Sequence, residues 1–460
     1  MKHISTARQP MIILFLTLLI SVSYSFIPEG FKLFGYELKQ VDMFIDVRQM
    51  DDYSYPAPDL QSSINKASVI DISDIKDLIG SAIYGKPSKT PAASFLYGNV
   101  SQLSYFFDAL KNARIKGLRI AHYGDSGIEG DLITADLRES FQSRYGGSAV
   151  GHLGIISQDI QFRTTTNHSF SSSSTWETAA LYSANLKGLP LGISGEVAIP
   201  KGNSWVRYET TGAQKSLKPF TTVRLFYTNA KNSSIKVYFN DSPSPKQFNL
   251  VAGTGVKELV IKSPSPSKSV KLEFPVMDQA YLFGVSLEGN QGVYIDNFPL
   301  RGNSGVDLQK ISSSMLKDYS KYLDYKLIIL EFGLNIAGQQ DYSFYEREMG
   351  KVIAHLREAY PKASILMISV HDKAVKRGSS FVTDPSILRL LQAQKDIAQK
   401  NNVALFSLFD AMGGMNSMDK WVRNNPPLAS TDYVHFNIFG AKKVADLIFN
   451  SLMDEFNKRK

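Results

Sequence analysis

The sequence predicts an α/β protein whose parallel, doubly wound sheet is interrupted by an all-β segment. After residue 290, short apolar runs alternate with amphipathic helical patterns, which is typical of βα units in a parallel sheet. A helical pattern followed by an apolar run also precedes residue 160. Between these parts, helical periodicity is lost and short β-like runs are separated by Ser/Pro turns. We therefore expect the α/β domain to resume after the β segment.

The length and composition of the chain are those of a globular protein with a large core. It has 460 residues, of which 43% are hydrophobic, enough for two to three domains. The net charge of +8 favours an anionic partner such as a membrane surface or cell wall. No dense Lys/Arg cluster interleaved with aromatic residues is present, so we expect no nucleic-acid partner. With no cysteine in the sequence, the chain has neither disulfides nor a cysteine-linked lipid.

The first 26 residues resemble an export signal. Lys2 and Arg8 precede an apolar run from Met11 to Val22, and Ser23-Tyr24-Ser25 supplies small residues for cleavage. The run is short for a membrane span, which needs about 20 residues. We favour a cleaved signal over an uncleaved anchor that would hold the protein near the membrane. Either reading predicts export to the periplasm or cell envelope.

The rest of the chain divides into four segments. We expect an N-terminal arm or linker without assigned chemistry, the first part of the α/β domain, an inserted β-sandwich, and the second part of the α/β domain. Their bounds are 27–95, 96–159, 160–290 and 291–460. At about 130 residues, the insertion has the size of a small domain.

The elements are expected in the following order. In the first part, a helical pattern around 103–110 leads to a strand at 117–122 and a helix at 131–145. The insertion contains strand-like runs at 205–208, 222–227, 235–239, 258–261, 270–274 and 281–285. The second part alternates strands at 293–295, 327–330, 364–370 and 403–408 with helices at 307–321, 342–359, 384–400 and 437–456.

The turn Gly124-Asp125-Ser126 directly follows the strand at 117–122 and precedes a helix. This position puts a serine hydroxyl at the carboxyl edge of the sheet, where open α/β sheets bind ligands. The N-terminus of the following helix offers N–H groups to a developing anion. Gly-Asp-Ser is common in ordinary turns, so a nucleophilic role for Ser126 depends on finding its partners.

A serine nucleophile needs a base, and the candidates are the seven histidines. Five of them fit less well than His435. His3 is in the signal, His168 in the β segment, His355 inside a helix, His122 in a strand where we expect it to be buried, and His371 at a strand end as a minor candidate for the base. His152, in a Gly-rich loop, could line the site.

His435 follows Asp432 by three residues, so both side chains can face the same way in a turn or first helical turn. Asp432 can then accept the Nδ1 proton of His435 and orient Nε2 toward a hydroxyl. The alternative is an exposed helix cap. Asn335, after Gly333 at another strand end, could donate its amide to an oxyanion, and the Gly305 N–H could be a second donor. Ordinary turns and caps remain the alternatives for both.

These motifs resemble the four blocks of the SGNH (GDSL) hydrolases, in the same order. They are Gly124-Asp125-Ser126, Asn303-Ser304-Gly305, Gly333-Leu334-Asn335 and Asp432 with His435. The resemblance implies a flavodoxin-like three-layer α/β/α domain without metal or organic cofactor. It implies Ser126 as nucleophile, His435 as base, Asp432 as its orienter, and an oxyanion hole formed by Ser126, Gly305 and Asn335. Gly302 and Gly154 are the alternatives for the second position.

The β insertion between the first and second blocks resembles that of bacterial peptidoglycan O-acetylesterases, whose insert is similar to a carbohydrate-binding jelly roll. Residues 413–418 and Trp421 also resemble this group and its O-acetyltransferase relatives. Aromatic residues in the insertion could stack on sugar rings, with burial in the sandwich core as the alternative. The candidates are Trp176, Trp205, Tyr208, Tyr227 and Tyr238.

The resemblance therefore implies a secreted serine esterase that removes O-acetyl groups from an acetylated envelope polysaccharide, most readily peptidoglycan. One alternative is an O-acetyltransferase that passes the same acetyl group to a sugar hydroxyl. Another is a non-catalytic glycan-binding envelope protein. The presence of Ser126, Asp432, His435 and Asn335 together argues against the last.

Overall fold

The computed structural model describes residues 32–33, 36–37, 95–183 and 186–459. The predicted signal at 1–26 and nearly all of the arm at 27–95 lie outside these residues. Of the arm, the structure describes two short antiparallel strands, β1 (Lys32–Leu33) and β2 (Tyr36–Glu37). They belong to a separate unit, and the residues from Ala93 to Lys460 form the second unit.

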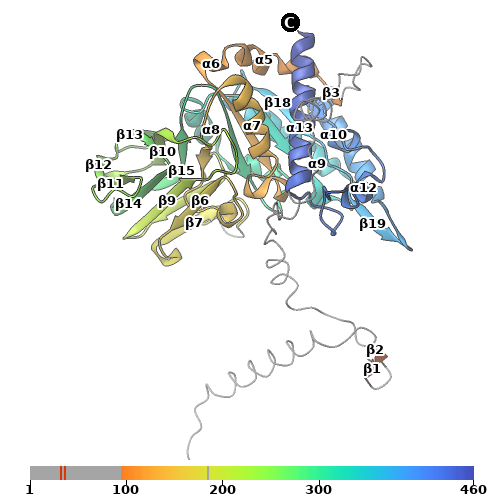
Figure 1. Cartoon of the computed structure of the whole chain (residues 1–460), viewed down its shortest axis with the longest axis horizontal. Coiled ribbons are helices and arrows are strands. Elements are labelled where there is room, and N and C mark those ends of the chain that lie inside the picture. Colours follow the sequence, from red (N-terminus) through yellow and green to blue (C-terminus); the bar gives the residue numbers. More distant parts are fainter. Residues whose placement is uncertain (1–31, 34–35, 38–94, 184–185, 460) are drawn as a thin grey trace, which may run out of the picture. The chain divides into compact units, whose positions relative to one another are not determined.

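A six-stranded sheet organises the α/β part of the second unit (Figure 1). Its order is β16 (Val293–Pro299), β4 (Leu118–Gly124), β17 (Tyr325–Glu331), β18 (Ser364–Ile368), β21 (Ala404–Phe406) and β3 (Leu96–Gly98). The first five strands are parallel, which confirms the predicted α/β class, and β3 is an antiparallel edge strand. All parallel strands therefore end at one edge.

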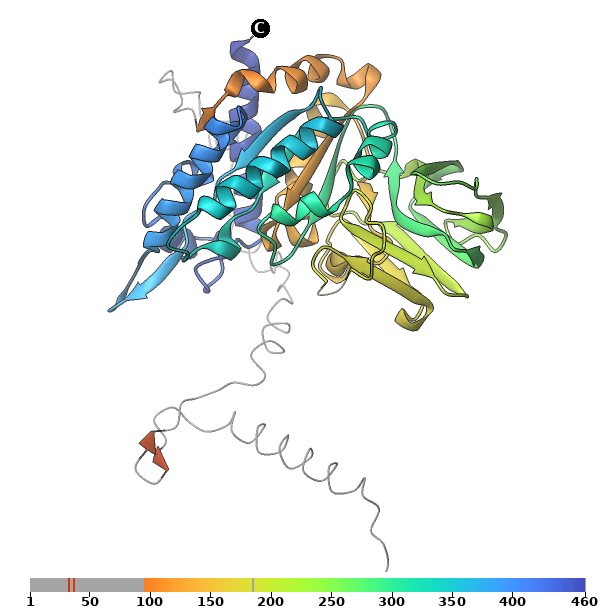
Figure 2. The ribbon, with the colours of Figure 1, turned by 180° about the vertical axis from the view of Figure 1, so that it is seen from behind.

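Helices cover both faces of this sheet (Figures 1 and 2). Those of one face are α5 (Ser104–Lys111), α7 (Thr134–Tyr145) and α13 (Ile438–Lys458), and those of the other are α8 (Ser313–Ser320), α9 (Ser343–Ala359) and α10 (Pro385–Lys400). Alternate strand residues face the two layers: Leu327 and Ile329 pack in one core, and Ile328 and Leu330 in the other. This burial on both faces is why the parallel strands are continuous apolar runs.

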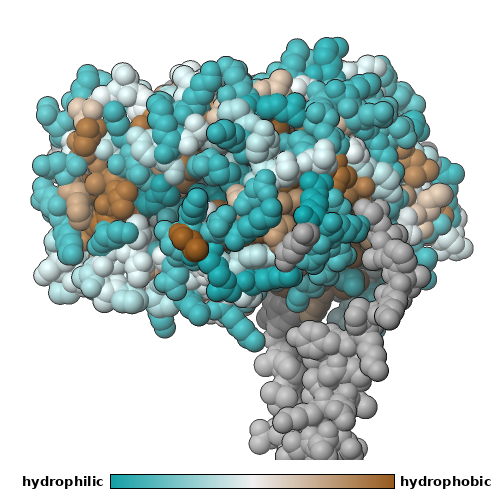
Figure 3. Space-filling model, turned by 90° about the horizontal axis from the view of Figure 1, so that it is seen from above, coloured by the Kyte–Doolittle hydropathy of each residue, from teal (hydrophilic) through white to brown (hydrophobic). Residues whose placement is uncertain are grey.

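Short elements complete the α/β part: η1 (Val100–Leu103), α6 (Ala113–Lys116), η2 (Ser126–Asp131), η5 (Val306–Lys310), η6 (Leu334–Ile336), α11 (Leu408–Ala411), α12 (Ser417–Val422) and the hairpin β19 (Ala374–Arg377) and β20 (Ser380–Thr383). Where 307–321 was expected to be one helix, η5 and α8 are separate. None of the described helices has the length and apolar character needed to cross a membrane. On the face drawn in Figure 3, hydrophilic residues predominate and hydrophobic residues form separate patches.

Two antiparallel sheets form the part between α7 and β16. One contains β13 (Lys257–Ser267), β10 (Phe220–Thr228), β15 (Tyr281–Glu288), β8 (Glu196–Pro200) and β7 (Trp176–Ala180), with β5 (Gly151–Leu153) on β15; the other contains β12 (Lys246–Asn249), β11 (Lys231–Phe239), β14 (Ser269–Asp278), β9 (Ser204–Thr210) and β6 (Thr166–Phe170). The connecting segments include η3 (Gln158–Gln161) and η4 (Ser173–Thr175). Inward residues of both sheets share one core. A jelly-roll strand order stays a prediction.

Three of the five aromatic residues considered for stacking on sugar rings lie inside the sandwich. Trp176, Tyr208 and Tyr227 are buried, so for these three the alternative, burial in the core, holds. Trp205 and Tyr238 are partly exposed, and the Lys271 ammonium lies over both rings. Strand register decides this difference, because the alternate residues of β9 face opposite sides of the sheet.

The first of the two antiparallel sheets packs against the α/β part. Phe226 of β10 contacts Tyr319 of α8, with ring centroids 5.5 Å apart, and the Tyr123 hydroxyl of β4 donates to the Ile193 carbonyl. Arg119 of β4 binds Asp296 of β16 and Glu288 at the end of β15. These contacts fix the β sheets beside the edge strand β16.

Candidate active site

The Ser126 turn lies where three parallel strands end. Gly124, the last residue of β4, pairs with Pro299 of β16 and Glu331 of β17. The Asp125 N–H donates to the Glu331 carbonyl, and the Asp125 carboxylate accepts the Gly127 N–H at 2.9 Å. This side-chain cap starts η2 at Ser126, whose own N–H is therefore one of the unpaired donors of a helix start.

At this edge of the sheet, the His435 ring lies between the side chains of Ser126 and Asp432. The Ser126 Oγ atom is 3.4 Å from His435 Nε2, and His435 Nδ1 is 2.7 Å from Asp432 Oδ2. The other Asp432 oxygen accepts the N–H groups of Val434 and His435. A turn just before α13, with Tyr433 at φ 59°, gives Asp432 and His435 this geometry. The ring is thus oriented with Nε2 toward the serine hydroxyl.

The Asp432–His435 contact shifts both pKa values. Partial burial alone would raise the pKa of Asp432, but the hydrogen bonds from the His435 ring and from two N–H groups outweigh it and lower the pKa to about 2. The hydrogen bond to Asp432 raises the pKa of His435 above its ordinary value, against the opposing effect of burial. Asp432 therefore remains a carboxylate while His435 gains and loses a proton.

Asn335, in η6 after β17, reaches the Ser126 turn. Its Nδ2 atom lies 3.0 Å from Asp125 Oδ2 and 3.0 Å from the Asn303 carbonyl oxygen. Two acceptors on the same side fix which end of the amide is the nitrogen. The structure therefore brings Asn335 beside the nucleophile turn, with its N–H donors on two protein acceptors.

Gly305 lies in the loop after β16 with φ 91°, the left-handed region. Its N–H donates to the Asn303 side chain at 2.7 Å, and Asn303 in turn donates to Asp307. A role for Gly305 as an oxyanion donor stays a prediction. Gly302 and Gly154 are the alternatives to Gly305 for the second oxyanion position. Gly302 is exposed with open space beside it, and Gly154 lies against Glu196 and Ser157.

None of the other described histidines contacts Ser126. The possibility that His152 lines the site is wrong, because it lies in β5, is 1% exposed and packs against Phe226 and Phe298. Burial lowers its pKa to about 4. His371 bonds through Nδ1 to the Asp372 carbonyl and is also buried. His122 is buried in β4 as expected.

A buried hydrogen-bonded chain behind the nucleophile turn was not anticipated. Asn297 donates to the Ile128 carbonyl, so its Oδ1 accepts from the Thr134 hydroxyl at 2.8 Å. With the hydroxyl proton so used, Thr134 Oγ1 must accept from His122 Nδ1 at 2.9 Å. The other ring nitrogen, Nε2, lies 3.0 Å from a carboxyl oxygen of Glu331. The sequence contained one signal for this hydrogen-bonded chain: Glu331, a carboxylate at the end of the apolar strand β17.

Asp125, in the nucleophile turn itself, is a buried titratable group close to Glu331. Burial raises its pKa to about 7, although the Gly127 N–H opposes the shift; the nearby Glu331 adds to it. A cavity of about 20 Å³, too small for a sugar, is lined by Asp125, Glu331 and His371 among others. The polar groups under Ser126 are therefore enclosed by protein.

The open side of the site carries an ion pair. Arg301 NH1 lies 3.1 Å from Glu129 Oε2, and half of the Arg301 side chain is exposed. Burial raises the pKa of Glu129, and Arg301 counteracts this. Within the described residues, no three His, Asp or Glu side chains are grouped so that they could hold a metal ion.

The chain shows no match to a protein-family model or to a curated protein. Among solved structures, it is similar to a peptidoglycan O-acetylesterase, with 20% identity, a TM-score of 0.65, and coverage of 79% of this chain and 99% of that one. Weaker similarities include an acetyl xylan esterase (20% identity, TM-score 0.27, 35% and 81% coverage) and a family two carbohydrate esterase from Cellvibrio japonicus (11%, 0.26, 64% and 99%). The first similarity shows that the chain shares the fold of that esterase.

Proposed function

We propose that the chain is an SGNH-type serine esterase that removes O-acetyl groups from a cell-envelope polysaccharide, with peptidoglycan as the preferred substrate. The alignment of Ser126, His435 and Asp432 at the carboxyl edge of the sheet carries this proposal. The fold shared with a peptidoglycan O-acetylesterase supports the substrate, and the net charge of +8 suits an anionic glycan. We expect export to the periplasm or envelope, as the N-terminal sequence predicts.

In the first half-reaction, Ser126 Oγ attacks the acetyl carbonyl carbon while His435 Nε2 takes the hydroxyl proton. The carbonyl becomes an oxyanion, for which the Ser126 N–H, Gly305 N–H and Asn335 amide are the proposed donors. Collapse of this intermediate breaks the ester bond, and His435 returns its proton to the departing sugar oxygen. The products are a free sugar hydroxyl and acetyl-Ser126.

In the second half-reaction, His435 removes a proton from water, which attacks the acetyl-Ser126 carbonyl. Collapse breaks the bond to Oγ, and the proton on His435 returns to the serine, so acetate leaves. Asp432 stabilises the imidazolium in both halves. The site residues need no other group for this sequence.

The test is acetate release by the full chain from O-acetylated peptidoglycan, acetylated xylan and an aryl acetate. Ser126→Ala should lower kcat by ~10⁴-fold or more. Ser104→Ala, at an exposed serine of α5, is the matched control and should leave the rate unchanged. Unchanged acetate release in Ser126→Ala would refute the enzyme proposal. Transfer of acetyl to added glycan, instead of release to water, would identify an acetyltransferase.

A further inference from the structure

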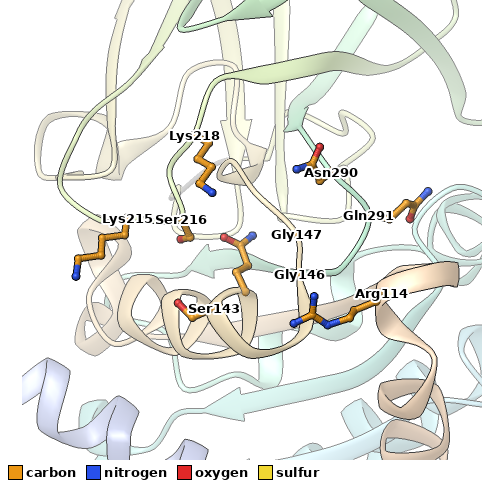
Figure 4. Close-up of a pocket in the computed structure, with 10 residues that line it drawn as sticks. Arg114, Ser143, Gly146, Gly147, Lys215, Ser216, Lys218, Asn290 and Gln291 are labelled. Carbon is orange, nitrogen blue, oxygen red and sulfur yellow. The ribbon is translucent and has the colours of Figure 1, made fainter.

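Figure 4 shows the lining of a second polar cavity, of about 450 Å³, which does not include Ser126. Its lining comes from α6, from the end of α7 and from the loops before β10 and β16. Asn290 and Gln291 of this lining precede β16, whereas Ser126 follows the carboxyl end of the parallel strand β4. With seven residues in β16 at about 3.3 Å each, the cavity and Ser126 are ~20 Å apart. The volume is in the range of small-molecule sites.

Positive side chains line this cavity without paired carboxylates. Arg114, Lys215 and Lys218 are exposed, and none of them forms an ion pair with another described residue. No Asp or Glu is part of the described lining. The adjacent Glu139 carboxylate is engaged: it accepts the Ser216 N–H at 2.8 Å. The cavity therefore has a local excess of positive charge.

One of these cations, Arg114, has a structural role at the C-terminal end of α7. Arg114 NH2 donates to the Arg144 carbonyl at 2.8 Å, which satisfies one of the free carbonyls at a helix end. Lys215 and Lys218 come from another segment, and their ammonium groups have no hydrogen-bond partner among the residues the structure describes. Helix capping therefore explains the position of Arg114 but not that of Lys215 and Lys218.

Two buried polar atoms of the lining also lack partners. Gln142 is 4% exposed, and its Nε2 donates to the carbonyls of Ala149 and Val293, so Oε1 can only accept. Neither this Oε1 nor the Oγ of Ser216, a residue 7% exposed, has a partner in the described part of the chain. Both atoms are covered by protein, so a ligand hydroxyl can pair with them only when the Gln142 and Ser216 side chains turn toward the cavity.

We propose that this cavity binds an anionic saccharide, a sugar ring that carries a carboxylate or a phosphate. The anionic group would face Lys215, Lys218 and Arg114, and ring hydroxyls would bond Gln142 Oε1 and Ser216 Oγ once these two side chains turn toward the cavity. A neutral sugar would leave the cations unpaired. An inorganic anion would supply few hydrogen-bond donors for the Gln142 oxygen. This binding site is independent of ester hydrolysis at Ser126.

The experiment is titration calorimetry of the full chain with glucuronate, glucose 6-phosphate, glucose and inorganic phosphate. We expect at least one of the two anionic sugars to bind at least tenfold more tightly than glucose and inorganic phosphate. The tighter of the two identifies the preferred anionic group. Lys215→Ala/Lys218→Ala should weaken that binding at least tenfold, with aryl acetate hydrolysis unchanged.

The matched control is Lys246→Ala/Lys268→Ala, which removes the same charge from exposed positions outside the cavity. It should leave the affinity unchanged. The single variants Lys215→Ala and Lys218→Ala replace the double variant if that one does not fold. Equal affinity for glucose or inorganic phosphate, no binding of either anionic sugar at 10 mM, or binding unaffected by the lysine variants would overturn the proposal.

Discussion

The Asn335 Nδ2 atom lies 3.0 Å from Asp125 Oδ2, so the loop after β17 is tied to the residue before the proposed nucleophile. The same nitrogen lies 3.0 Å from the Asn303 carbonyl oxygen, which ties it to the loop after β16. One amide therefore holds together the loops that follow three neighbouring strands. In the reaction proposed above, one of its N–H groups must turn to, or be shared with, the oxyanion.

Replacing Asn335 by Ala should lower kcat for an aryl acetate by ~10²–10³-fold, the cost of losing one oxyanion donor. KM should change little, because the donor is needed in the transition state. Asn335→Asp keeps the shape but places a second carboxyl beside Asp125, and should be at least as impaired. A kcat unchanged in Asn335→Ala, measured by steady-state kinetics on folded protein, would remove Asn335 from the oxyanion hole.

Asp125 should make the stability of the fold depend on pH. Its pKa is raised to about 7 by burial, against an ordinary value of 3.8. Between these values the native state holds a proton that the unfolded chain has released, so this contribution to the free energy of unfolding falls as pH rises from about 4 to 7. Asp125→Asn removes this contribution. Urea unfolding at pH 5 and pH 8 checks this: the stability of the unmodified chain relative to Asp125→Asn should decrease at pH 8.

The pH profile of activity should reflect His435. Its hydrogen bond to Asp432 raises its pKa above the ordinary 6.5, and only the neutral ring can accept the Ser126 proton. kcat/KM should therefore rise with pH, with a midpoint above 6.5. Asp432→Asn should move this midpoint to lower pH and reduce kcat by up to ~10⁴-fold. The same midpoint in both proteins would contradict the assignment of His435 as the base.

The parallel strands could be predicted from the sequence because each is buried on both faces and therefore forms a continuous apolar run. The run at 327–330, for example, is apolar at every position and lies within β17. Asp432 and His435 share a turn, and Ser126 follows the end of β4. The Asp432–His435 contact is therefore local in the sequence, whereas the contact with Ser126 depends on the fold.

The features that could not be predicted from the sequence depend on pairing between strands that are far apart in the chain. His152 was read as a loop residue because glycines surround it, but its strand pairs with β15, more than 130 positions later. The inward direction of Tyr208 likewise depends on the register between β9 and β14. The antiparallel strand β3 has three residues, too few for a period to be recognised.

Gly305 should be intolerant of a side chain. Its φ is 91°, and a Cβ added there would lie 2.7 Å from the Phe332 ring. Gly302→Ala is the matched control, since its φ is also positive, at 74°, but the space around it is open. Urea unfolding should show a loss of ~1–2 kcal/mol in the control from backbone strain alone. Gly305→Ala should lose clearly more, and equal losses would show that Phe332 yields without cost.

The buried ion pair between Arg119 of β4 and Asp296 of β16 should contribute strongly to stability. Arg119 is 8% exposed and bonds Asp296, which is fully buried and also accepts the Tyr325 hydroxyl at 2.7 Å. Arg119→Met would leave the Asp296 carboxylate without its cation, at a cost of ~3–5 kcal/mol. Lys442→Ala breaks an exposed pair with Asp446 and should cost at most ~1 kcal/mol. Urea unfolding measures both, and because breaking the buried pair strands a charge, a similar small loss in Arg119→Met would mean that water reaches Asp296.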